Sequence, residues 1–179
     1  PLTNNMNIFD AALKLSQLRD GKLPKGLPRE MAVAGMMPVH VGGMMMNMRA
    51  IGSFAADHGL WVIEDGAHAF PSAWRPGPDE PWRRCGEGTA QVTCFSFYAN
   101  KTITTGEGGM AVTENIEIAE RMQSMSLHGL SQNAWGRYSN AGSWDYKVIA
   151  PGYKYNLTDI AAAIGIHQLA KAEKMRQMR

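Results

Sequence analysis

The sequence has little of what marks a secreted, membrane-spanning or nucleic-acid-binding chain. It holds two cysteines in 179 residues, and Cys85 and Cys94 form neither a CxxC pair nor a disulfide framework. No metal site is therefore predicted, and a reducing, cytoplasmic setting fits best. No apolar run approaches the roughly 18–20 residues that a membrane span needs. The net charge is only +2 and the basic residues are scattered, so neither a membrane nor a nucleic acid is expected as a partner.

What is present fits one globular unit with an ordinary balance of residues, 45% hydrophobic and 19% charged. Short apolar runs alternate with segments of helical periodicity, which is typical of an α/β protein with a mainly parallel sheet. The chain begins at Pro1 and ends at Arg179 within an expected helix. We therefore expect it to be part of a longer protein.

The periodicities predict the elements of this sheet and their order. Helices are expected at 8–20, at 47–58, at 115–126 and after Thr158. The first should have Ile8, Phe9, Ala12 and Leu13 on its apolar face, and the second should have Asn47 as its cap. The segment 71–88 is rich in proline, glycine and charge, which predicts an exposed loop. Buried strands are expected at 31–37, 60–64, 92–98 and 109–113.

Four polar side chains follow two of these strands. Asp65 and His68 come after the strand at 60–64, and Ser96 and Lys101 lie at or beyond the end of the strand at 92–98. A glycine-rich turn, 106–109, comes next. Because ligands of parallel α/β sheets bind beyond the carboxyl ends of the strands, we expect these side chains to lie near one another.

An amine, a carboxylate, an imidazole and a hydroxyl together suit a site for pyridoxal 5'-phosphate. A lysine amine forms a Schiff base with the cofactor aldehyde, and a carboxylate keeps the pyridine nitrogen protonated. Each residue also has a simpler interpretation. Lys101 alone is more often a solvated surface lysine, Asp65 could cap a turn, and His68 and Ser96 could serve structure only.

Four blocks in order resemble the DegT/DnrJ/EryC1/StrS family of sugar aminotransferases. They are VIEDGAHAF, CFSFYANKTITTGEGGMAVTEN, HGLSQNAWGRYS and PGYKYNLTDIAAAIGIHQLAKAE, and the likeness covers about residues 37–173. The resemblance implies a three-layer, mainly parallel α/β fold of the pyridoxal-phosphate fold type I and a homodimer. It also implies transfer of an amino group, usually from glutamate, to a nucleotide-linked keto sugar. Such reactions serve cell-surface polysaccharide, lipopolysaccharide or antibiotic-sugar biosynthesis.

Carried over by position, the resemblance gives each candidate a role. Lys101 is the catalytic lysine that binds the cofactor, and Asp65 pairs with the pyridine nitrogen. His68 lies against the ring or its phenolic oxygen, and Ser96 binds the phosphate. An Asn of the GYxYx segment reaches the phosphate of the neighbouring subunit in relatives. Here that role falls to Asn156, because Lys154 occupies the place of Asn in many members.

The sequence also departs from the family pattern. The stretch WRPGPDEPWRRCG between Asp65 and Lys101 looks like an inserted surface loop. The turn that grips the phosphate and the ring-stacking aromatic are expected before Pro1, and a smaller domain after Arg179. Residues 1–179 are thus expected to form the central part of the cofactor-binding large domain, with an N-terminal segment and a C-terminal small domain missing.

Two other functions stay open. Some relatives are sugar dehydratases that carry His in place of the lysine, and Lys101 argues against that activity. A non-catalytic member or an inactive fragment is the other alternative. Further candidates for substrate contact, each with a structural alternative, are His40, His128, Trp135, Arg137, Trp144 and Tyr146.

Overall fold

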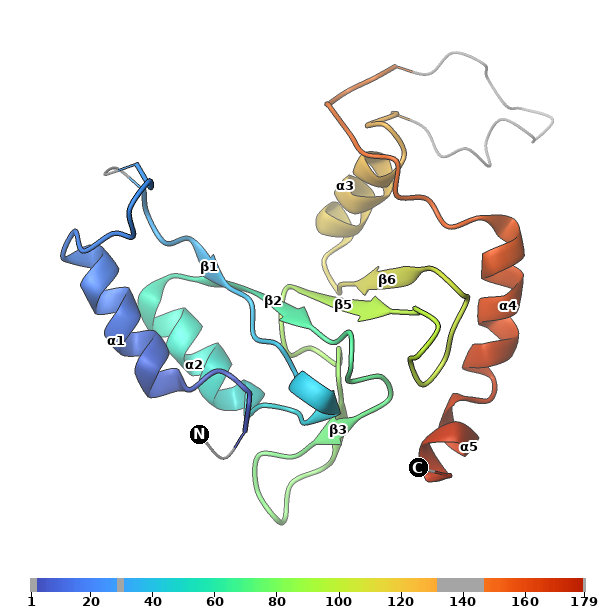
Figure 1. The fold of residues 1–179 in the computed structure, drawn as a ribbon, viewed down its shortest axis with the longest axis horizontal. Coiled ribbons are helices and arrows are strands. Elements are labelled where there is room, and N and C mark those ends of the chain that lie inside the picture. Colours follow the sequence, from blue (N-terminus) through green and yellow to red (C-terminus); the bar gives the residue numbers. More distant parts are fainter. Residues whose placement is uncertain (1–2, 29–30, 132–146, 179) are drawn as a thin grey trace.

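A four-stranded sheet lies at the centre of the computed structural model, which describes residues 3–28, 31–131 and 147–178. Its strand order is β1 (Gly35–Met36), β2 (Trp61–Asp65), β5 (Val92–Ser96) and β6 (Gly109–Val112). The strands β1, β2 and β5 are parallel, and β6 runs antiparallel to β5. The expected α/β fold with a mainly parallel sheet and flanking helices is confirmed (Figure 1).

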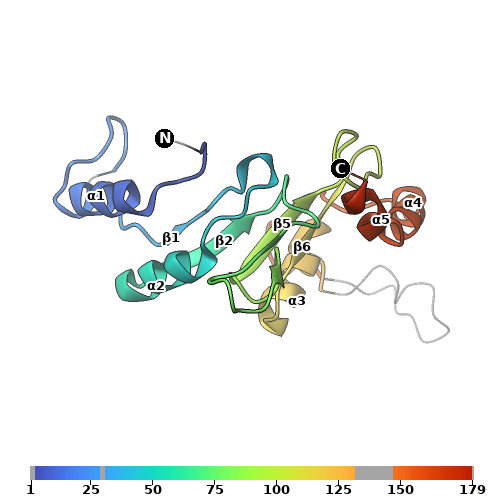
Figure 2. The ribbon, with the colours of Figure 1, turned by 90° about the horizontal axis from the view of Figure 1, so that it is seen from below.

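The helices lie at the two ends of this sheet. The first two, α1 (Ile8–Arg19) and α2 (Met48–His58), lie side by side near β1 and β2, whereas α4 (Asp159–Leu169) and α5 (Ala172–Gln177) lie beyond β6 (Figures 1 and 2). Helix α3 (Ile116–Ser126) follows β6, and the short 3-10 helix η1 (Val41–Gly43) precedes α2. Among the residues described, no helix combines the length and apolar character needed to cross a membrane.

Helix α2 carries the main core. Met48, Ile51 and Ala55 are buried, as their helical spacing predicts, and they pack with Val62 of β2 and Leu15 of α1. The helix begins at Asn47, whose side chain accepts a hydrogen bond from the Ala50 N–H. It ends at Gly59, whose positive φ of 67° suits glycine. Local sequence signals therefore place this helix correctly.

Replacing Asn47 by Ala should destabilise the protein by about 1 kcal/mol, because the Ala50 N–H loses its acceptor. Chemical denaturation would measure the change. Asn47→Asp, which keeps the acceptor oxygen, should recover most of it. If both variants lost the same free energy of unfolding, the hydrogen bond of the Asn47 side chain would contribute nothing to stability.

The predicted strand at 31–37 is largely wrong. Within this run only Gly35–Met36 forms strand pairs with β2, and Met31 and Met37 are 51% and 54% exposed. Within the described residues β1 is an edge strand, so the apolar run has no neighbour on its other side. Gly35 is required where it lies, because a Cβ there would collide with the indole ring of Trp61.

Two further expectations need correction. In α1 the buried residue is Leu15, whereas Phe9 and Leu13 of the expected apolar face are exposed, because the helix packs chiefly on α2. The segment 71–88 is not simply an exposed loop. It contains an antiparallel pair, β3 (Ala73–Trp74) and β4 (Arg83–Arg84), and Trp74 and Cys85 are buried.

Candidate functional site

The carboxyl ends of β2 and β5 lie at the same edge of the sheet. The two strands pair in parallel, with Asp65 opposite Cys94, so Ser96 lies two residues beyond this pair on β5. Asp65 is the last residue of β2 and Ser96 the last of β5. Both strand ends, and the loops that follow them, therefore lie next to each other at this edge of the sheet.

A cavity of about 240 Å³ opens at this edge and contains three of the predicted residues. His68, Ser96 and Lys101 line it together. Lys101 is half-buried, and its amine makes no hydrogen bond or ion pair with any residue that the structure describes. The remaining lining residues are Gly42, Ala67, Phe70, Asn100, Thr102 and Ile103. The cavity thus offers an amine, unpaired within the described part of the chain, beside a hydroxyl and an imidazole.

Asp65 lies at the same strand end but does not line this cavity. Its Oδ1 accepts a hydrogen bond of 3.0 Å from the Ala67 N–H, which stabilises the turn after β2. No bond to Oδ2 is found among the described residues, so one oxygen stays available to a ligand. The turn-capping role and the ligand-binding role are therefore compatible.

The hydroxyl of Ser96 can donate to a ligand, because among the residues with a described placement its oxygen only accepts, from the Tyr98 N–H at 3.3 Å. The glycines at 106–109 do not line the cavity. A Cβ on Gly109 would lie 2.6 Å from the Phe95 carbonyl oxygen on the neighbouring strand.

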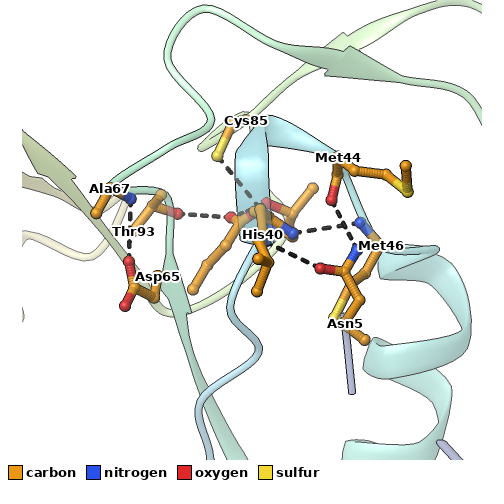
Figure 3. Close-up of polar contacts among 11 residues, drawn as sticks. Asn5, His40, Met44, Met46, Asp65, Ala67, Cys85 and Thr93 are labelled. Atoms are coloured by element: carbon orange, nitrogen blue, oxygen red, sulfur yellow. Dashed lines mark hydrogen bonds and ion pairs between the residues drawn. The ribbon is translucent and has the colours of Figure 1, made fainter. Parts of the chain in front are cut away.

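Directly behind the strand end lies a buried polar network that the sequence interpretation missed (Figure 3). Glu64 is fully buried, and its Oε1 lies 2.6 Å from Nε2 of the equally buried His40. The hydroxyls of Thr89 and Thr93 donate to the other carboxylate oxygen, at 2.5 and 2.7 Å. The structural role of His40 is therefore the one observed. A glutamate at a buried position of β2, two residues after buried Val62, was the signal available in the sequence.

The same network determines the ionisation of its members. Burial would raise the pKa of Glu64, but the hydrogen bonds from His40, Thr89 and Thr93 outweigh it and hold this pKa below its ordinary value. Since the Met46 N–H donates to Nδ1 of His40 at 3.2 Å, the ring proton lies on Nε2 and points at Glu64. Glu64 is thus a buried carboxylate surrounded by donors.

Cys85 completes a group with His40 and Glu64 whose possible ligand atoms lie within 4.8 Å of one another. The thiol lies 3.6 Å from Glu64 Oε1, and burial, followed by the charge of Glu64, raises its pKa. A metal needs the thiolate and a free imidazole lone pair, whereas Cys85 stays protonated and His40 Nε2 carries a proton. The geometry is that of a hydrogen-bond network.

Two further candidates, Asn156 and His128, do not line the cavity. Asn156 and His128 are both exposed. The backbone N–H of His128 donates to the Tyr153 carbonyl. The assignment of Asn156 to a neighbouring subunit stays a prediction. Four candidates fall outside the described residues, namely Trp135, Arg137, Trp144 and Tyr146.

Comparison with known proteins bears directly on this arrangement. The chain is 51% identical over 144 residues to an uncharacterized protein of Methanocaldococcus jannaschii, covering 80% of this chain and 36% of that one. It is 45% identical over 152 residues to the spore coat polysaccharide biosynthesis protein SpsC of Bacillus subtilis, covering 85% and 36%. The chain therefore spans about a third of the length of these relatives.

A solved structure shares the fold. A Streptococcus pneumoniae protein assigned as a sugar aminotransferase, in its PLP form, superposes with a TM-score of 0.62 at 26% identity, covering 79% of this chain and 37% of that one. The model of the DegT/DnrJ/EryC1/StrS aminotransferase family matches residues 28–179. The match extends over both strand ends and the whole cavity, and the chain therefore belongs to the DegT/DnrJ/EryC1/StrS aminotransferase family.

Proposed function

We propose that this chain carries the catalytic part of a pyridoxal-phosphate-dependent aminotransferase, which moves an amino group from glutamate to a nucleotide-linked keto sugar. The observation that carries the proposal is the cavity in which the amine of Lys101, with no partner among the residues described, lies with Ser96 and His68 at the carboxyl ends of parallel strands. Membership of the aminotransferase family supports it.

The residues present fit the cofactor. Lys101 would hold the aldehyde carbon through its Nζ, and Ser96 would donate its hydroxyl proton to the phosphate. Asp65 would pair its free carboxylate oxygen with the ring nitrogen, and His68 would lie against the ring. When bound, the cofactor supplies an electron sink for the carbanion that forms at the carbon next to the substrate nitrogen.

Lys101 is the group of this chain that would transfer the proton of the substrate. Lys101 Nζ would take the proton from the substrate Cα, hold it as an ammonium and return it later in the reaction. A half-buried amine without an internal ion pair is suited to this, because no carboxylate among the described residues holds its charge. The Asp65 carboxylate would balance the positive charge of the ring nitrogen.

The sugar substrate is inferred from relatives. SpsC belongs by name to spore coat polysaccharide biosynthesis, and the pneumococcal protein is assigned to sugar amination. We also propose that residues 1–179 form the central part of the cofactor-binding domain in a homodimer, in which Asn156 reaches the phosphate of the partner. Its exposure, away from the cavity of its own chain, is compatible with that role.

The visible absorption spectrum of the full-length protein with pyridoxal 5'-phosphate tests this function. We expect a visible band from the lysine-bound cofactor, which L-glutamate bleaches as the cofactor is converted to its amine form. D-Glutamate is the matched control and should leave the band in place, because it presents its Cα proton differently. A protein that binds the cofactor with no band, or whose band L-glutamate leaves unchanged, would refute the proposed reaction.

A further inference from the structure

The loop between β1 and α2 forms one wall of the candidate cofactor cavity. Gly42, within η1, lines the cavity, and its N–H donates to Nδ1 of His68 at 3.3 Å. Gly43 packs against the backbone of His68 so closely that a Cβ there would lie 2.8 Å from the His68 carbonyl oxygen. The position of this loop therefore determines how the His68 ring is held.

One side of the loop rests on the buried network. The His40 N–H donates to the Asp65 carbonyl at 3.1 Å, and the Asp65 N–H donates to the Pro38 carbonyl at 2.9 Å. The His40 ring then bridges the Met46 N–H and Glu64 (Figure 3). Both ends of the loop, at His40 and Met46, are thus anchored to the end of β2.

The other side is held by a single side chain from the N-terminal segment. Asn5 Oδ1 accepts from the Val41 N–H at 2.9 Å, and Asn5 Nδ2 donates to the Met44 carbonyl at 2.8 Å. One amide therefore closes both ends of η1, from a position 36 and 39 residues earlier in the sequence. Figure 3 shows Asn5 beside Met44 and Met46, on the side of His40 opposite Cys85.

We propose that Asn5 is a positioning residue for the cofactor cavity: it closes η1 against the His40–Glu64 network, so that the Gly42 N–H orients the ring of His68. Asn5 itself does not line the cavity. The role of His68 toward a cofactor rests on the proposed function, whereas the bracing of the loop does not. A short turn whose inner residue has a φ of 64° needs such support, because few internal hydrogen bonds hold it.

Hydrogen exchange of the Gly42 amide in the full-length protein without cofactor tests the bracing. In Asn5→Ala the loop loses two hydrogen bonds, and the exchange rate of Gly42 should rise by about tenfold or more, equivalent to about 1.4 kcal/mol. Asn115→Ala is the matched control, because Asn115 also bonds two backbone groups, the N–H groups of Glu117 and Ile118, but at the start of α3. It should leave Gly42 unchanged.

Cofactor affinity, measured on the same variants, tests the consequence for the site. Asn5→Ala should weaken binding of pyridoxal 5'-phosphate severalfold, and Asn115→Ala should not. Asn5→Asp, which keeps the acceptor for Val41, should give intermediate exchange and affinity. Faster exchange at amides throughout the chain, or no selective change at Gly42, would overturn the proposal. A wild-type protein that binds no cofactor but shows the selective exchange would overturn the proposed function and leave the brace standing.

Discussion

Replacing Lys101 by Ala should abolish the visible band of the bound cofactor and lower the transamination rate by a factor on the order of 10²–10⁴ or more, the range that a positioned proton-transfer group contributes. The reason is geometric. Lys101 supplies an amine at this cavity, and it has no internal partner among the residues described. Under the proposed function, its removal would take away both the covalent attachment of the cofactor and the group that moves the proton.

The matched control for this change is Lys174→Ala, on the exposed face of α5. It should keep the band and the rate, because Lys174 lies outside the cavity lining. Pre-steady-state absorption with L-glutamate would measure the rate in both variants. If Lys101→Ala retained the band and turned over normally, another amine would hold the cofactor and the assignment of Lys101 would be wrong.

The largest effect on stability is expected from Glu64→Ala, which should lower the free energy of unfolding by about 3–5 kcal/mol, because several donors lose one shared acceptor. The substitution leaves the buried donors of His40 and Thr93, and the part-buried hydroxyl of Thr89, without their acceptor. The total free energy of unfolding of a native protein is only about 5–15 kcal/mol. The midpoint of urea denaturation should therefore fall strongly, whereas exposed Glu117→Ala should change the free energy by less than about 0.5 kcal/mol.

The stability of the network should also depend on pH. The pKa of Glu64 in the folded protein lies below its ordinary value of 4.5, so between these two values the unfolded chain binds the additional proton. The stabilisation is complete above about 4.5 and is lost as the pH falls through the lower folded value. Glu64→Gln, which fills the same space without charge, should lack this component. Identical pH profiles for wild type and Glu64→Gln would contradict the ionised state of Glu64.

Part of the site could be predicted because it depends on strand ends and short turns. Asp65 and Ser96 were identified from where apolar runs stop, and parallel pairing then brings the strand ends together. Caps at Asn47 and Thr158 are visible for the same reason, since each side chain bonds a backbone N–H three residues later. Contacts between residues three positions apart can be recognised from the local sequence alone.

Other features depend on partners far apart in the sequence. The length of β1 follows from its place at the edge of the sheet, and the burial of Cys85 follows from its contact with Glu64, 21 residues earlier. Neither the spacing nor the residue types of the run at 31–37 or of the segment 71–88 contain that information. In the structure the strand predicted at 31–37 is therefore shorter, and the loop predicted at 71–88 contains a pair of strands.

The sequence by itself determined the α/β class, the family and the four polar residues at the strand ends, because these follow from periodicity and from motifs in order. Only the tertiary structure decided that His40 supports Glu64 and that Asn5 braces the loop against His68. It also showed that Asp65 lies beside the cavity lined by Lys101, not in its wall. The physical reason is that a hydrogen bond across 24 or 36 residues depends on how the whole chain packs, and no local pattern encodes it.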